Sequence, residues 1–155
     1  MRVFCLILLC VLSGCRKNRL TEIQAVPTAK VDHHKLPGEP VCGSVQTLPS
    51  GVQIYVLEEG KGATPVAGDK VYVQYRGYLP IGIEIDSSER AGKPLSFVLG
   101  AGGVIAGWED AVAHLHRGSR AKVIIPWEHA YGTEGSAPSV PPESPLIFDM
   151  TLLLE

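Results

Sequence analysis

The chain has little of several features that would point to particular classes of protein. Charged residues make up 19% of its 155 residues and the net charge is −2, so it lacks the excess of Lys and Arg that binding to nucleic acid requires. It has no apolar run of about 20 residues, the length that crosses a bilayer. An apolar content of 45% excludes a wholly disordered chain, and a collagen-like repeat is missing.

Common signatures of nucleophilic, metal and nucleotide chemistry are also missing. There is neither a GxSxG nor an HExxH motif. Residues 100–107 look like a dinucleotide-binding loop, but GxGxxG requires a glycine where Ile105 stands, and no βαβ unit surrounds them. His114 and His116 do not share a face of a helix, so they do not suggest a zinc site. The sequence therefore predicts no resident metal and no cofactor.

Cysteine is scarce, and three of the four cysteines lie in the first 15 residues. Arg2 and the apolar run of residues 3–12 are typical of a secretory signal. The string Leu12-Ser13-Gly14-Cys15 resembles the lipobox of bacterial lipoproteins. The resemblance implies cleavage before Cys15 and attachment of a diacylglycerol to its sulfur. An ordinary signal peptide with an incidental cysteine is the alternative.

We accordingly expect a lipoprotein signal peptide at residues 1–14, followed by the lipidated Cys15 and a flexible tether to residue 43. The tether contains several prolines and shows no sustained period of 2 or 3.6. Because more than one buried acyl chain gives lasting attachment, we expect the protein to be anchored in the cell envelope. The outer membrane is favoured in a cell with two membranes, because Arg16 rather than aspartate follows Cys15. The tether is too short for a helical dimerisation arm, which favours a monomer.

From residue 44 the pattern becomes that of a β-rich domain extending to residue 155. Alternating apolar residues predict strands near residues 52–57, 71–75, 95–99, 121–125 and 146–152. Trp108, Val112 and Leu115 share a face of a short predicted helix that Gly118 ends. Since loops connect the strands, the sheet is expected to be antiparallel. The predicted fold class is α+β, a twisted antiparallel β-sheet wrapped around one short α-helix.

Five segments of this domain match a known family in order. They are VQYRG at residues 73–77, DSS at 86–88, GVIAGWE at 103–109, AYG at 130–132 and LIFD at 146–149. Together they resemble the FKBP-type peptidyl-prolyl cis-trans isomerases over residues 46–155. The resemblance implies a half-open antiparallel sheet around a short helix. It also implies proline-containing polypeptide substrates, macrolide ligands such as tacrolimus, and a reaction with no covalent intermediate.

The same resemblance implies an apolar pocket that receives the substrate proline, with Trp108 as its floor. Asp86 would lie at the pocket edge near the reacting amide, and the Tyr131 hydroxyl and the Ile105 N–H would donate to substrate carbonyls. The residues expected to bind substrate are Tyr75, Ile85, Leu95, Val104, Trp108, Val140 and Phe148.

Two departures from the family leave other functions open. Ile85 and Leu95 stand where the family commonly has phenylalanine, so the pocket has less aromatic bulk. One alternative is a weakly catalytic or non-catalytic chaperone lipoprotein that binds Pro-containing segments. Another is an envelope lipoprotein whose fold only presents a surface. In that case Trp108 would be ordinary core and Asp86 would merely cap a turn.

Overall fold

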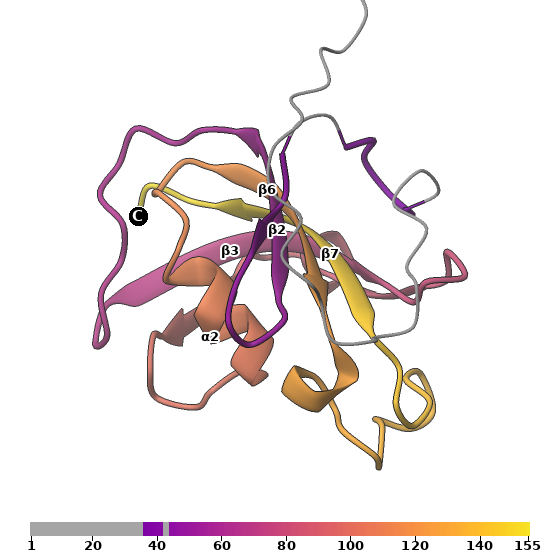
Figure 1. The fold of residues 1–155 in the computed structure, drawn as a ribbon. Helices are drawn as coiled ribbons and strands as arrows, with labels where there is room; N and C mark the ends of the chain where they lie inside the picture. Colours follow the sequence, from indigo (N-terminus) through magenta and orange to yellow (C-terminus); the bar gives the residue numbers. More distant parts are fainter. Residues whose placement is uncertain (1–35, 42–43) are drawn as a thin grey trace, which may run out of the picture.

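An antiparallel sheet of seven strands forms the framework of this computed structural model, which describes residues 36–41 and 44–155 (Figure 1). The strand order is β1-β2-β6-β7-β3-β4, and β5 also pairs with β3. The result confirms the predicted α+β class. The strands are β1 (Gln46–Thr47), β2 (Gln53–Glu58), β3 (Lys70–Tyr78), β4 (Glu84–Ser87), β5 (Leu95–Val98), β6 (Arg120–Ile125) and β7 (Leu146–Leu152).

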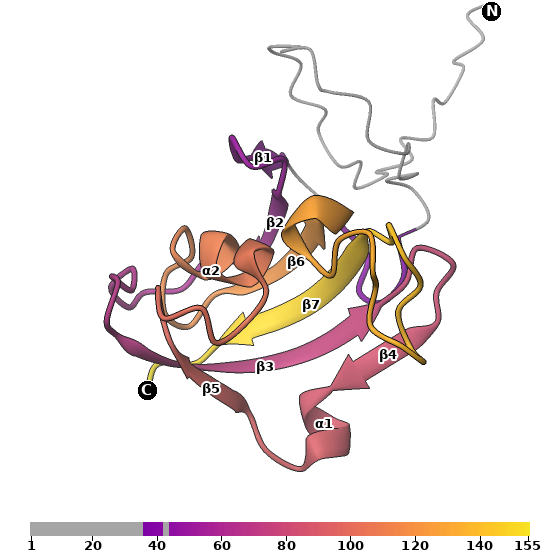
Figure 2. The ribbon, with the colours of Figure 1, turned by 90° about the horizontal axis from the view of Figure 1, so that it is seen from below.

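The helix α2 (Ala106–Val112) packs across one face of the curved sheet, as Figure 2 shows. It is shorter than predicted, because the chain leaves the α-helix after Val112 and not at Gly118. The N–H of Leu115 donates to the carbonyl of Val112 (3.2 Å), a tighter turn than that of an α-helix. Leu115 still reaches the core, with 1% of its surface exposed. No helix in the described ranges has the length and apolar character needed to cross a membrane.

Two further helices and two short strands were not predicted. They are α1 (Ser88–Ala91), η1 (Trp127–His129), β1 and β4. The Ser87 hydroxyl accepts from the Arg90 N–H (3.3 Å) at the start of α1, and Gly92 ends α1 at a φ of 71°. The capping residue is therefore Ser87 and not Asp86.

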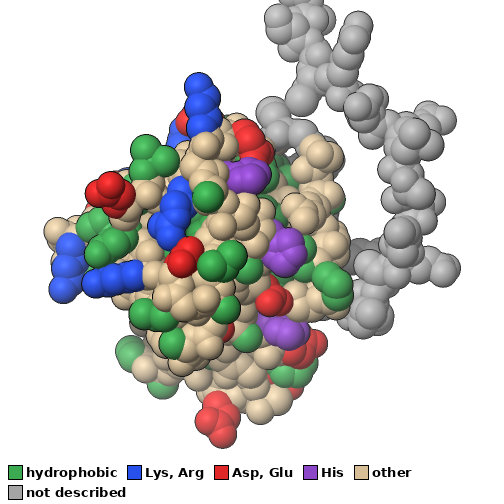
Figure 3. All heavy atoms as spheres, turned by 90° about the vertical axis from the view of Figure 1, so that its left-hand side faces the viewer, with side chains coloured by type: hydrophobic (Ala, Val, Ile, Leu, Met, Phe, Trp, Pro, Cys, Tyr) green, Lys and Arg blue, Asp and Glu red, His purple; other side chains and the backbone are tan. Residues whose placement is uncertain are grey.

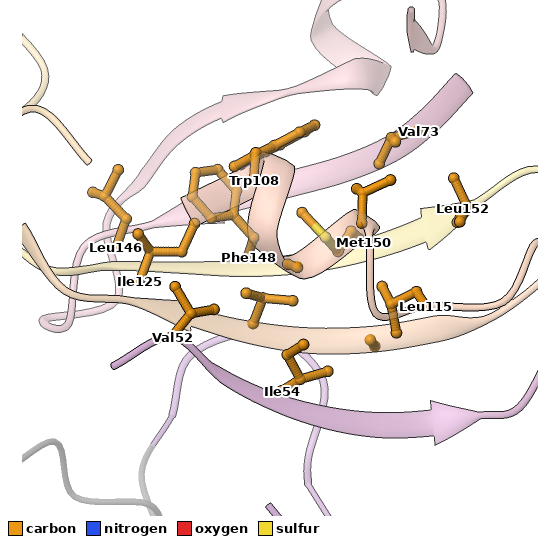
Figure 4. Close-up of a cluster of buried hydrophobic side chains, with 14 of the residues drawn as sticks. Val52, Ile54, Val73, Trp108, Leu115, Ile125, Leu146, Phe148, Met150 and Leu152 are labelled. Carbon is orange, nitrogen blue, oxygen red and sulfur yellow. The ribbon is translucent and has the colours of Figure 1, made fainter. Parts of the chain in front are cut away.

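The strands bury side chains on both faces of the sheet, because successive residues point in opposite directions. The larger cluster lies between the sheet and α2, and Figure 4 shows Trp108 beside Phe148 within it. A smaller cluster consists of Tyr55, Tyr78, Ile124 and Ile147. Ile147 precedes Phe148 in β7, so the small cluster lies on the face opposite α2.

Residues 36–41, which we call the strap, cover the small cluster. Leu36 and Val41 pack against it. The buried ammonium of Lys122 donates to the Pro37 carbonyl (2.5 Å) and lies 2.5 Å from a carboxylate oxygen of Asp149. The strap therefore differs from the flexible tether that was expected over residues 15–43. Its apolar residues and backbone groups find partners on the sheet that the sequence pattern does not show.

Candidate active site

Three aromatic rings from three elements meet between the sheet and α2. Tyr75 of β3 lies 4.9 Å from Trp108 of α2 between ring centroids, and Phe148 of β7 lies 5.3 Å from Trp108. Both contacts are edge-to-face, the arrangement that the ring quadrupoles favour. Phe97 of β5 adds a fourth ring 6.2 Å from Trp108, and it was not predicted as a site residue. The tertiary structure thus brings together the predicted floor and its two aromatic walls.

Two glycines of the family motifs allow this close packing. A Cβ on Gly77 would lie 2.6 Å from Cε1 of Phe148, which is directly opposite it in the β3–β7 register. A Cβ on Gly107 would lie 2.3 Å from Cγ2 of Ile125. A side chain at residue 77 would therefore displace the Phe148 ring, and one at residue 107 would push α2 away from the sheet.

Tyr75 also connects the rings to a carboxylate at the rim. Its hydroxyl donates to Oδ2 of Asp86 (2.5 Å), and Oδ1 of Asp86 accepts from the Ser87 N–H (2.8 Å). Burial, followed by the hydrogen bond to Asp86, raises the pKa of Tyr75 well above its usual value of 10, and Tyr131 contributes to the rise. Tyr75 is therefore a protonated donor at neutral pH, and it holds Asp86 in one orientation.

Ser88 fixes the backbone of Tyr75, a role that was missed in the sequence. Its hydroxyl accepts from the Tyr75 N–H (3.0 Å) and donates to the Tyr75 carbonyl (3.3 Å). These bonds take the place of strand pairing, because β5 pairs with β3 only up to Val73 and β4 begins its pairing at Arg76. The only signal in the sequence is the position of Ser88 in the DSS segment.

The remaining predicted residues form a rim of mixed exposure. Ile85, Val104 and Ile105 are partly buried and pack against the larger cluster. Val140, from the loop of residues 130–145, is buried.

Leu95 and Tyr131 lie further out, with 36% and 42% of their surface exposed. Leu95 is not part of the large cluster. Within residues 36–41 and 44–155, neither the Ile105 N–H nor the Tyr131 hydroxyl donates to a protein acceptor. Two donors at the rim are therefore available to a ligand.

A groove of about 530 Å³ is lined in part by Tyr75 and Ser88 but not by Trp108 or Phe148. It has polar walls and extends over strands β3, β6 and β7 to Glu39 of the strap. Two of its charges are already paired, Arg76 with Glu89 (2.6 Å) and Arg120 with Glu39 (2.5 Å). Such a groove suits an apolar prolyl ring less well than the aromatic cluster does.

Histidine and acidic side chains are spread over one side of the molecule (Figure 3). In the part of the chain that the structure describes, no three His, Cys, Asp or Glu residues are placed to hold a metal ion.

Comparison with known proteins identifies the family. The model of the FKBP-type peptidyl-prolyl cis-trans isomerases matches residues 61–153. The chain belongs to this family. The segments that carry Tyr75, Asp86, Trp108, Tyr131 and Phe148 all lie inside the match.

Relatives of this isomerase occur in eukaryotes and bacteria. FK506-binding protein 1 of the yeast Debaryomyces hansenii is 43% identical over 108 residues, which cover 69% of this chain and 96% of the relative. The isomerase FkpA of Escherichia coli K12 is 44% identical over 109 residues, but the match covers only 39% of its length. The crystal structure of AtFKBP13 superposes with a TM-score of 0.69 at 31% identity, covering 73% of this chain and 98% of that one.

Family membership makes the chain a peptidyl-prolyl cis-trans isomerase by class. The roles of the individual site residues stay predictions from the resemblance. The bacterial lipoprotein form also stays a prediction, because the relatives from Debaryomyces hansenii and Escherichia coli match at similar identity. The signal peptide, Cys15 and most of the expected tether lie outside the described residues.

Proposed function

We propose that this isomerase accelerates rotation about X–Pro bonds in exported proteins, and that the aromatic cluster is where the prolyl ring binds. The observation that supports this is the meeting of Tyr75, Trp108 and Phe148 beside an oriented Asp86. Because Trp108 is only 3% exposed, the prolyl ring of the substrate approaches it from the rim, where Val104 and Ile105 are partly buried.

The chemistry follows from the electronic structure of the amide. Twisting the bond destroys resonance between nitrogen and carbonyl, which gives a barrier of about 18–20 kcal/mol. The planar amide carries more charge separation than the twisted one, so water stabilises the ground state more. A site of apolar walls removes that advantage, and fixed hydrogen bonds stabilise the twisted geometry. No covalent intermediate is needed.

Each rim residue has a place in this scheme. The Ile105 N–H and the Tyr131 hydroxyl donate to two substrate carbonyls and hold the chain on either side of the rotating bond. The Asp86 carboxylate, held by Tyr75 and the Ser87 N–H, faces the amide. Ile85 and Val140 form part of the apolar wall, and Leu95 lies further out.

The test is turnover of an X–Pro peptide by the full chain. We expect Asp86→Ala and Tyr131→Phe each to lower kcat/KM about tenfold, which corresponds to about 1.4 kcal/mol of transition-state stabilisation. Tyr72→Phe is a matched control, because Tyr72 is another tyrosine of this domain outside the aromatic cluster. Tacrolimus is expected to compete with the peptide. A folded wild-type protein with no turnover above the uncatalysed rate would refute the proposal.

We also propose that a lipid on Cys15 anchors the protein as a monomer in the cell envelope, in the outer membrane of a cell with two membranes. The lipobox string supports this, and so does the position of the strap. The strap lies on the face opposite α2, away from the aromatic cluster. Labelled palmitate should enter the wild type and Cys10→Ser but not Cys15→Ser. Incorporation into Cys15→Ser would contradict the anchor.

A weakly catalytic chaperone is the second candidate, because Leu95 lies outside the cluster and leaves that wall open. The two functions respond differently to Asp86→Ala. Loss of activity on peptides together with loss of function in cells supports the enzyme. Retained function in cells supports binding of Pro-containing segments as the main role.

A further inference from the structure

The hairpin that joins β3 to β4 presents two isoleucines to solvent. Ile81 is 78% exposed and Ile83 is 55% exposed. The tip is well defined, because the Leu79 N–H donates to the Ile83 carbonyl (2.9 Å) and Gly82 takes a φ of 90°. Pro80 precedes Ile81 and fixes its own φ. Two large apolar side chains are therefore held in water on a rigid turn.

The isoleucines continue the wall of the aromatic site. The hydrogen bond from Leu79 places Ile83 opposite a residue of the large cluster, so Ile83 lies on the face that carries α2. Ile85 packs against the large cluster, and its Cγ1 lies 3.4 Å from the position a Cβ on Gly77 would take. Leu79, bonded to Ile83, belongs to the same cluster. Apolar side chains therefore extend from the large cluster, through Leu79 and Ile83, to the tip of the hairpin.

Half of the large exposed apolar side chains that the structure describes belong to the hairpin or to the predicted site. Of the eight exposed large hydrophobic residues in the described ranges, two are in the hairpin and two more, Leu95 and Tyr131, are predicted site residues. Single exposed hydrophobic residues are ordinary, but two on one turn beside a binding site indicate a contact surface. The hairpin and the loop of residues 130–145 lie at the same end of the sheet (Figures 1 and 2).

We propose that Ile81 and Ile83 form an apolar subsite for the substrate polypeptide beyond its proline. The proposal rests on the proposed function, because it assumes that the prolyl ring binds at the aromatic cluster. Ile83 lies opposite Leu79 and Asp86 lies opposite Gly77, so Ile83 is two residues, about 7 Å, from Asp86 along β3, and Ile81 at the tip lies about one residue further. An extended substrate covers the length to the tip in about three residues. The preferred substrate therefore carries a large apolar side chain about three residues from its proline.

The experiment compares two sets of peptides of equal length with the full chain. One set has leucine three residues before or after the proline, and the other has serine at the same position. We expect the wild type to have a kcat/KM about fivefold higher for the better leucine peptide than for its serine partner, equivalent to about 1 kcal/mol. The variant Ile81→Thr/Ile83→Thr should bring this ratio close to one.

The matched control is Val66→Thr, since Val66 is 65% exposed in the loop that precedes β3. In Figure 1 that loop lies at the opposite end of β3 from the hairpin. It should keep the wild-type ratio. Equal kcat/KM for leucine and serine peptides in the wild type overturns the subsite, while turnover of both still supports the proposed function. Turnover of neither overturns the proposed function, and the ratio of binding affinities for labelled peptides then tests the subsite. A variant that loses binding to phosphatidylcholine vesicles but keeps the peptide ratio would identify the tip as a membrane contact.

Discussion

Replacing Lys122 by methionine should destabilise the protein, because the carboxylate of Asp149 loses its buried cationic partner. Lys122 is 0% exposed, and its ammonium contacts the Asp149 carboxylate and the Pro37 carbonyl at 2.5 Å each. Removing one partner of a buried ion pair costs about 3–5 kcal/mol. Asp149 keeps a hydrogen bond from the Glu39 N–H (2.8 Å) and is 13% exposed, which places the cost near the lower end. We expect a loss of about 3 kcal/mol of unfolding free energy.

The assay is denaturant unfolding of a double-mutant cycle. Lys122→Met/Asp149→Leu removes both charges, and apolar residues of similar size often replace a buried pair without loss. The double variant should recover to within about 1 kcal/mol of the wild type, a coupling energy of at least about 2 kcal/mol. Amide exchange at Glu39 should be faster in both variants, because each removes a contact of the strap. Strictly additive losses would refute the reasoning.

Two further predictions concern the aromatic site. Because burial and Asp86 raise the pKa of Tyr75, this group contributes stability that is present below about pH 10, its unfolded value, and is lost as pH rises through the folded pKa. The stability difference between the wild type and Tyr75→Phe should therefore shrink by about 1 kcal/mol between pH 8 and pH 11, as measured by urea unfolding, and a constant difference would contradict it. Gly107→Ala, whose Cβ would lie 2.3 Å from Ile125, should cost about 2 kcal/mol in thermal unfolding, whereas Gly103→Ala, whose Cβ would meet Phe97 only at 4.0 Å, should cost little. Equal melting temperatures for the two glycine variants would show that α2 can move away from the sheet.

Patterns that repeat along the chain could be interpreted without a structure. The alternation in residues 71–75 and 146–152 predicted β3 and β7, because a strand with one buried face repeats every two residues. The ordered motifs predicted the family. The helix α1 was missed because four residues make only about one turn, and β4 was missed because a bulge interrupts its register with β3.

The sequence by itself determined the strand pattern, the family and the list of candidate site residues, because these depend on local periodicity and on motifs read in order. Only the tertiary structure decided which of those residues meet. It brought Tyr75, Trp108 and Phe148 together from three elements, joined Tyr75 to Asp86, and left Leu95 outside the cluster. It also showed that the strap docks on the sheet through Lys122 and Asp149, residues far from it in the chain. Contacts between distant residues depend on register and packing, which leave no repeating signal along the sequence.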